Sequence, residues 1–142
     1  MPEVTFYVLS AKTLNERYLF VCKLVEKIFR SGIGCYLLTE DKQQSRYLDD
    51  LLWTFRPGSF IPHECFTGEL PTLKHVSLIG ETEPPSDWRH TLINLSTHCP
   101  IDMESVGRIL EVLVQEPTVL EPGRQRYRHY QQAGLAITTH TL

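Results

Sequence analysis

Three arginines and two tyrosines close to the C-terminus form the group of side chains best suited to binding chemistry. They lie in the run Arg124-Gln125-Arg126-Tyr127-Arg128-His129-Tyr130. At helical spacing Arg124, Tyr127 and Arg128 share one face, and Tyr130 and Ala133 extend the tyrosine side toward the core. Guanidinium groups bind carboxylates through paired hydrogen bonds, and a neighbouring ring holds the bound side chain. The run therefore predicts a site for an acidic peptide that ends in an aromatic residue and a free carboxylate.

Two other interpretations of this run stay open at the level of sequence. The same trio suits single-stranded nucleic acid, because arginine contacts phosphate and tyrosine stacks on bases. Alternatively, the run is a solvated basic face that balances Glu116 and Glu121. The whole chain argues against broad capture of nucleic acid, since 14 Lys and Arg stand against 17 Asp and Glu and the net charge is −3.

A second candidate surface combines aromatic and proline residues at the end of a predicted helix. Trp53 lies at that end, and the loop after it reads Arg56-Pro57-Gly58-Ser59-Phe60-Ile61-Pro62-His63. A loop backbone stays solvated or paired, so these side chains are not all expected to be buried. Exposed Trp and Phe are enriched at the centres of protein interfaces. The sequence favours either a partner-binding patch here or a cover of rings over the end of a sheet.

Patterns typical of phosphate binding, metal binding and catalysis are absent from the sequence. Ser10-Ala11-Lys12-Thr13 follows the first predicted strand without the glycines that let a backbone approach a pyrophosphate. The short clusters His63-Glu64-Cys65 and His98-Cys99 have no spacing that brings them to one metal ion. The four cysteines contain no C-x-x-C pair and are expected to be reduced thiols. We therefore predict a protein that is not an enzyme and that uses neither a cofactor nor a metal. The alternative is a small α/β nucleotide-binding enzyme whose site matches no recognised motif.

Alternating strands and helices are predicted to position both surfaces. The strand predictions cover 5–9, 35–38, 76–79, 92–95 and 109–114, with a short helix before the last of these from 103 and a short edge strand within 135–142. The helix predictions run from a Thr13 cap to Gly32, over 42–55 and from about 121 to 133, and 59–63 is predicted to be an extended loop. This order builds a parallel sheet through right-handed crossovers. The predicted fold is α/β, with three layers around a mainly parallel sheet, in a single domain over 1–142.

Length and composition place the chain among ordinary globular domains. It has 142 residues, of which 42% are hydrophobic and 22% charged. No run of 18 apolar residues is present, so no membrane span is expected. The start, Met1-Pro2-Glu3, lacks the basic region of a secretory signal, and a cytoplasmic location is expected.

Five stretches of the chain carry a resemblance when they are taken in order. They are Thr5-Phe6-Tyr7-Val8-Leu9, Asp49-Asp50-Leu51-Leu52-Trp53, Ser59-Phe60-Ile61-Pro62-His63, Ile93-Asn94-Leu95, and Arg124 to Tyr130 followed by Ala133-Gly134. Together they resemble the chi subunit of the bacterial DNA polymerase III holoenzyme, an accessory protein of its clamp loader. The combination of D-x-x-L-W with S-F-I-P-H is the most specific part, and the likeness covers nearly the whole chain.

The resemblance implies a non-enzymatic bridging protein whose α/β fold resembles a nucleotide-binding domain without a phosphate-binding loop. One surface of such proteins binds the acidic, phenylalanine-ended C-terminal tail of single-stranded-DNA-binding protein, so contact with nucleic acid is mostly indirect. Another surface binds the psi subunit or a psi-like clamp-loader partner, and in some bacteria a helicase-like protein competes for it. By position, Arg124, Tyr127 and Arg128 belong to the tail pocket. The psi-side patch takes Trp53, Phe60, Pro62 and His63.

The chain departs from this family pattern just before the last predicted helix. Residues 116–123 form a shorter segment than in chi relatives, and Leu120 stands where a lysine helps to line the tail pocket. The resemblance therefore implies a less basic pocket and a weaker affinity for the tail.

Overall fold

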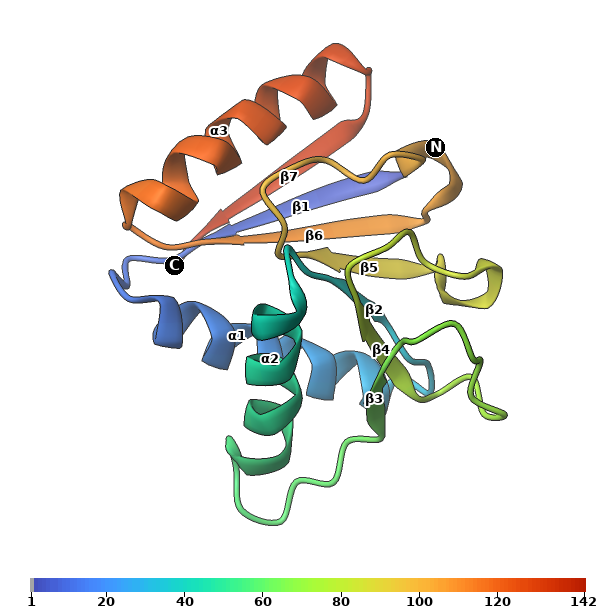
Figure 1. Cartoon of the computed structure of the whole chain (residues 1–142). Helices are drawn as coiled ribbons and strands as arrows, with labels where there is room; N and C mark the ends of the chain where they lie inside the picture. Colours follow the sequence, from blue (N-terminus) through green and yellow to red (C-terminus); the bar gives the residue numbers. More distant parts are fainter. Residues whose placement is uncertain (1) are drawn as a thin grey trace.

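The structure, a computed structural model that describes residues 2–142, is built on a sheet of seven parallel strands (Figure 1). The order across the sheet is β3-β4-β2-β5-β6-β1-β7. All neighbouring strands pair in parallel. The strands are β1 (Glu3–Val8), β2 (Tyr36–Leu38), β3 (His63–Cys65), β4 (Ser77–Gly80), β5 (Thr91–Asn94), β6 (Arg108–Leu113) and β7 (Ala136–Thr141).

Helices cover the two faces of this sheet and make it the middle of three layers. Helices α1 (Leu14–Arg30) and α2 (Lys42–Thr54) lie on one face, and α3 (Pro117–Gln132) lies on the other, over the half that holds β6, β1 and β7 (Figure 1). Short 3-10 turns, η1 (Ser86–Trp88) and η2 (Met103–Ser105), interrupt the loops before and after β5. The predicted three-layer α/β fold with a parallel sheet is confirmed.

The central strands of the sheet are buried, and the edge strand β7 is exposed. Every residue of β2, β4 and β5 is buried, as expected for central parallel strands that are covered on both faces. At one edge of the sheet, β7 is exposed along nearly its whole length. The core therefore centres on the middle strands, and both candidate surfaces lie outside it.

The first helix begins and ends at the signals predicted from the sequence. The Thr13 hydroxyl accepts a hydrogen bond from the Glu16 amide at 3.2 Å and donates to the Glu16 carboxylate at 2.8 Å. The helix stops at Arg30, and Gly32 follows with a φ of 95°, a left-handed conformation that favours glycine. The segment after residue 103 also folds as predicted, into a short helical turn followed by a strand.

Three local predictions were wrong. The extended loop was predicted to include His63, but 63–65 form β3, because these residues pair with β4 from His63↔Ser77 onward. The last helix begins at Pro117 instead of near 121, since proline is favoured in the first turn and the Glu116 carboxylate accepts from the Thr118 amide at 2.9 Å. Ala133 is exposed and does not extend the core side of that helix.

Candidate functional site

A cavity of about 240 Å³ opens between α3 and the carboxyl-terminal halves of β1 and β6. We call it the α3 pocket. Its lining is mostly apolar, and its charged group is the Arg124 guanidinium on the α3 side. The lining residues are Phe6, Val8, Leu113, Gln115, Leu120, Gly123, Arg124, Tyr127 and Thr139.

Two contacts between α3 and the sheet shape this pocket. The Tyr127 ring packs against the Phe6 ring of β1, with 5.2 Å between centroids. Gly123 lets the helix approach β6, because a Cβ atom there would lie 2.5 Å from Cδ2 of Leu113. The pocket floor thus depends on residues from three separate parts of the chain.

Arg124 is the arginine whose guanidinium is best placed to bind a ligand in this pocket. Its Nη1 donates to Glu121 Oε1 at 3.0 Å, one helical turn back, and the two side chains are 56% and 63% exposed. Exposed ion pairs of this kind contribute well under about 1 kcal/mol, so an incoming carboxylate can displace Glu121 at little cost. Arg128 is exposed one turn further along the same face of α3 and does not line the pocket.

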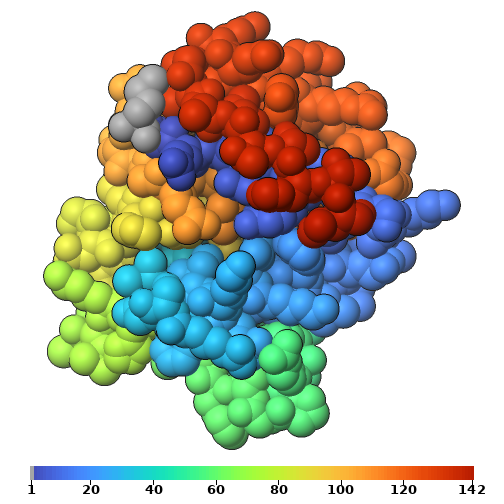
Figure 2. All heavy atoms as spheres, turned by 180° about the vertical axis from the view of Figure 1, so that it is seen from behind, coloured from blue at the N-terminus to red at the C-terminus, as the bar shows by residue number. Residues whose placement is uncertain are grey.

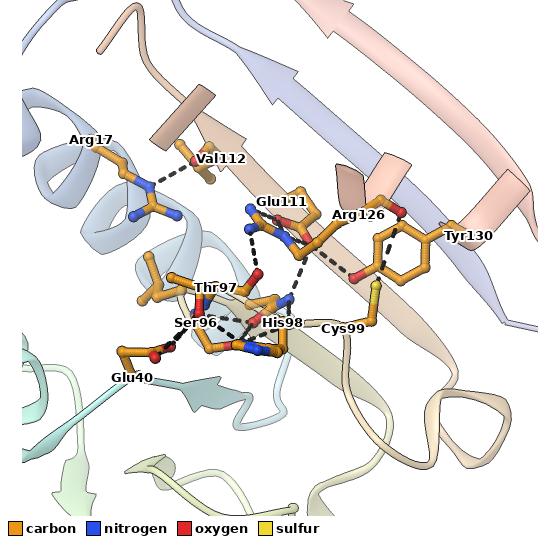
Figure 3. Close-up of polar contacts among 12 residues, drawn as sticks. Arg17, Glu40, Ser96, Thr97, His98, Cys99, Glu111, Val112, Arg126 and Tyr130 are labelled. Carbon is orange, nitrogen blue, oxygen red and sulfur yellow. Dashed lines mark hydrogen bonds and ion pairs between the residues drawn. The ribbon is translucent and has the colours of Figure 1, made fainter. Parts of the chain in front are cut away.

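Arg126 lies apart from this basic surface and is buried. Its Nε and Nη2 donate to the Glu111 carboxylate of β6 at 3.0 and 2.8 Å, and its Nη1 donates to the Thr97 carbonyl at 3.3 Å (Figure 3). The same carboxylate accepts from Tyr130 Oη at 2.7 Å and from Asn94 Nδ2 at 3.1 Å. We call Asn94, Glu111, Arg126 and Tyr130 the Glu111 network. It joins α3, β6 and β5, and Arg126 therefore serves the fold.

The electrostatics of the Glu111 network favour a fixed protonation state. Burial raises the pKa of the Tyr130 hydroxyl, and the nearby charge of Glu111 raises it further. Burial alone would lower the pKa of Arg126, but the Glu111 charge and hydrogen bonds outweigh it and raise that pKa above its ordinary value. The tyrosine thus stays a donor and the arginine stays a cation.

The Glu111 network was not predicted from the sequence, although the chain carries two signals for it. Glu111 interrupts an otherwise apolar strand, and a buried carboxylate needs a cation or several donors as partners. In α3 the buried positions are Val119, Gly123, Arg126 and Tyr130, at the spacing of one helix face. Together these signals point to an inward-facing Arg126.

Thr13 and Arg17 make contacts near the carboxyl ends of the parallel strands, which is where open α/β sheets bind ligands. Thr13 caps α1 after β1, at the place where a phosphate-binding loop would lie. Arg17, in the first turns of α1, is buried, and its Nε donates to the Val112 carbonyl of β6 at 2.8 Å (Figure 3). Burial lowers the pKa of this guanidinium. Arg17 therefore ties α1 to β6 inside the fold.

The second candidate surface lies on the loop after α2. Phe60 is 80% exposed and Trp53 is 53% exposed, so Phe60 does not cover the end of the sheet. The Glu26 carboxylate of α1 holds the loop, since it accepts a hydrogen bond from Ser59 Oγ at 2.8 Å and forms an ion pair with Arg56 Nη1, also at 2.8 Å. In Figure 2 the atoms around residue 60, in green, project from the molecule as a lobe.

His63 and Pro62 differ from their exposed neighbours. His63 is buried, with Nδ1 2.7 Å from the Ile61 carbonyl oxygen and Nε2 3.1 Å from the Asp49 carbonyl oxygen. Its ring lies 4.4 Å from that of Trp53, and Pro62 is half-buried. His63 therefore supports Trp53 from beneath instead of lying on an exposed patch.

Over residues 2–142, no three His, Cys, Asp or Glu side chains come together closely enough to hold a metal ion. The four thiols, Cys22, Cys35, Cys65 and Cys99, are free. Within the same range, no helix has the length and apolar character needed to cross a membrane.

Comparison with solved structures gives the fold alone. The crystal structure of T4 UvsW matches with a TM-score of 0.68 at 10% sequence identity, over 99% of this chain and 41% of that chain. At this low identity the match supports the α/β architecture and carries no argument about function.

Comparison of sequences is more specific. Residues 1–138 match the family model described as DNA polymerase III chi subunit, HolC. DNA polymerase III subunit chi of Pseudomonas aeruginosa is 34% identical over 144 residues, covering all of this chain and 98% of the relative. The Escherichia coli subunit is 29% identical, with 99% of each chain covered, and the Haemophilus influenzae subunit is 26% identical, with 96% and 95% covered. The chain therefore belongs to the DNA polymerase III chi subunit family.

Proposed function

We propose that this protein is a non-catalytic accessory subunit that links the clamp-loader complex to single-stranded-DNA-binding protein. It does so by binding the acidic C-terminal tail of that protein in the α3 pocket. The observation that carries the proposal is the apolar α3 pocket with an exposed guanidinium among its lining residues. The pocket and the charge match the two ends of a terminal aromatic residue, its ring and its carboxylate.

The size of the α3 pocket favours a single aromatic side chain. Its volume of about 240 Å³ is below the range of about 300–1,000 Å³ that is typical of sites for drug-sized molecules. A ring placed there contacts Phe6, Leu113 and Leu120, and the Arg124 guanidinium is then available to the terminal carboxylate. Because Leu120 is apolar, it adds hydrophobic contact and no charge, so the affinity rests more on ring burial than on ion pairs.

The aromatic loop supplies the second half of the proposed bridge. Trp53 and Phe60 present exposed rings to a psi subunit, a psi-like clamp-loader partner or a helicase-like competitor, Pro62 lies at their margin, and His63 positions Trp53. A cavity of about 210 Å³ beside Phe60, lined in part by Phe29 and Ile61, offers a place for an apolar side chain of that partner.

The tail site is tested by titrating a labelled acidic peptide that ends in phenylalanine. We expect Arg124→Ala to lower the affinity several-fold, because a hydrogen bond to a charged group contributes about 1.5–3 kcal/mol when it is partly desolvated. Affinity should also fall with added salt, since exposed ion pairs are screened.

Arg46→Ala serves as the matched control, because Arg46 is an exposed helical arginine on α2, outside the α3 pocket. Unchanged affinity in the Arg124 variant would remove that residue from the site. A short single-stranded oligonucleotide is titrated in parallel. Tight binding of the oligonucleotide, with no binding of the peptide, would favour direct nucleic-acid recognition and contradict the proposal.

A further inference from the structure

Strand β7 is an edge strand without the usual protection against pairing. Its six residues, Ala-Ile-Thr-Thr-His-Thr, contain no proline and no lysine, the residues that commonly keep sheet edges from pairing. It pairs with β1 on one side, and within residues 2–142 no strand pairs with its other side. In Figure 2 the darkest red atoms, at the end of the chain, lie on the surface with nothing over them.

The hydrogen bonds at the chain end show which backbone groups of β7 face outward. Leu142 donates from its amide to the Val8 carbonyl at 2.9 Å and accepts from the Ser10 amide at 3.0 Å, so its backbone faces β1. In a parallel strand both polar groups of one residue point to the same side, and the side alternates along the chain. The amides and carbonyls of Ile137, Thr139 and Thr141 therefore point outward.

These outward groups lie beside the α3 pocket. Thr139 lines the pocket, and its register partner in β1 is Phe6, which packs against Tyr127 of α3. The row of Arg124 and Arg128, one helical turn apart, lies on the exposed face of α3. An extended acidic segment beside β7 would therefore have backbone partners along one side and cationic side chains from α3 near it.

We infer that the residues preceding the tail's terminal phenylalanine bind as an eighth strand on β7, paired with the backbone of Ile137, Thr139 and Thr141. This inference rests on the proposed function. The α3 pocket lies at the carboxyl ends of β1 and β6, so a peptide that ends in the pocket and lies along β7 runs parallel to it. Arg128, which does not line the pocket, then faces the acidic residues upstream of the phenylalanine.

Addition of a strand gives binding a signature that a simple pocket lacks. A paired strand uses every second backbone amide, so methylating the peptide nitrogens one at a time should weaken binding with a period of two residues. We expect about a fivefold or larger loss at each bonded amide and little change at the alternate amides. The measurement is a fluorescence-anisotropy titration of the full chain with a series of acidic, phenylalanine-ended peptides.

A pair of variants tests the protein side of the same contact. Thr141→Pro removes an outward amide and keeps the pairing with β1, a position at which an edge strand tolerates proline. Thr141→Val removes the hydroxyl and keeps the amide, and Thr141 is exposed and does not line the α3 pocket. We expect Thr141→Pro to weaken binding about fivefold and Thr141→Val to bind like the unmodified protein, with thermal melting showing that both are folded.

The possible results separate this inference from the proposed function. If the unmodified peptide binds but the methylation series has no period, strand addition is overturned and the pocket remains. If the unmodified peptide does not bind at all, the proposed function fails and this inference fails with it. A self-association that Thr141→Pro abolishes, together with an aperiodic series, would assign the edge to a second copy of the chain and would also overturn the inference.

Discussion

Arg124 and Arg126 lie two positions apart in α3 and have different environments. Residues two apart on a helix face different directions, so one guanidinium is exposed beside the α3 pocket and the other enters the core. Arg124 has a weak, exposed ion pair with Glu121, whereas Arg126 meets a fully buried carboxylate that also accepts from two other side chains. The first arginine is available to a partner and the second stabilises the position of the helix that carries it.

Within the Glu111 network, loss of the single Tyr130 hydroxyl group should lower the free energy of unfolding. Tyr130→Phe removes a donor to a buried carboxylate and keeps the ring that packs near Phe6. We expect the free energy of unfolding to fall by about 1.5–3 kcal/mol, the contribution typical of a hydrogen bond to a charged group. Urea denaturation monitored by tryptophan fluorescence measures the change.

The control for this variant is Tyr47→Phe. The Tyr47 hydroxyl also makes a short side-chain hydrogen bond, to Asn15 at 2.7 Å, but at an exposed site. Its loss should change stability by no more than about 0.5 kcal/mol. Equal effects of the two variants would mean that burial of the Glu111 network contributes nothing to the strength of the Tyr130 contact.

At the scale of elements, α3 is a helix that packing maintains against its own composition. It begins at Pro117 and contains Pro122 and Gly123, two residue types that disfavour the helix interior. Tertiary contacts override this preference, because Tyr127 packs on β1 and Arg126 is bonded to β6. The same glycine that weakens the helix permits its close approach to Leu113.

Gly123→Ala should separate the stability of α3 from its binding role. Alanine raises helix propensity by about 0.5–1 kcal/mol, but its Cβ would displace Leu113, whose side chain lines the α3 pocket and moves into it. We expect unfolding free energy within about 1 kcal/mol of the starting protein and a several-fold loss of affinity for the acidic peptide. Melting curves and the peptide titration measure the two effects.

Gln125→Ala is the control for Gly123→Ala, since Gln125 is exposed on the same helix and away from the α3 pocket. It should leave peptide binding unchanged. Normal binding in the Gly123 variant would show that Leu113 does not shape the occupied pocket.

At the scale of the molecule, the two proposed surfaces lie at opposite ends of the sheet. The aromatic loop follows α2 and leads into edge strand β3, while the α3 pocket lies beside the other edge strand, β7. Figures 1 and 2 both show the green loop at one extreme of the molecule and the orange and red α3 segment at the other. This separation would let one small domain hold two partners without a clash.

Because the two surfaces are far apart, a variant that loses binding to one partner should still bind the other. Phe60→Ala should abolish capture of the clamp-loader partner without lowering the melting temperature much, because the ring is 80% exposed. Its binding to the acidic peptide should be normal, and Arg124→Ala should show the reverse pattern. A pull-down with each partner, with and without competing peptide, measures both; a large loss of stability in the Phe60 variant would instead indicate a packing role.

What the sequence determined by itself was local or repetitive. The Thr13 cap, the order of strands and helices, the parallel sheet and the edge strand at the chain end follow from contacts within a few residues or from patterns of burial. The family, too, was recognisable from short stretches read in order. These features need no knowledge of which distant side chains meet.

Only the tertiary structure decided which residues meet across the fold. Arg126 pairs with Glu111 on β6. The His63 ring packs against the Trp53 ring, and His63 belongs to β3, which pairs with β4. Residues of β1, β6 and β7 line the α3 pocket together with residues of α3. The physical reason is that helical spacing places Arg124, Arg126 and Arg128 on a helix but does not say which face another element will cover. Packing of α3 on the sheet made that choice, and with it decided which of the three charges can reach a partner.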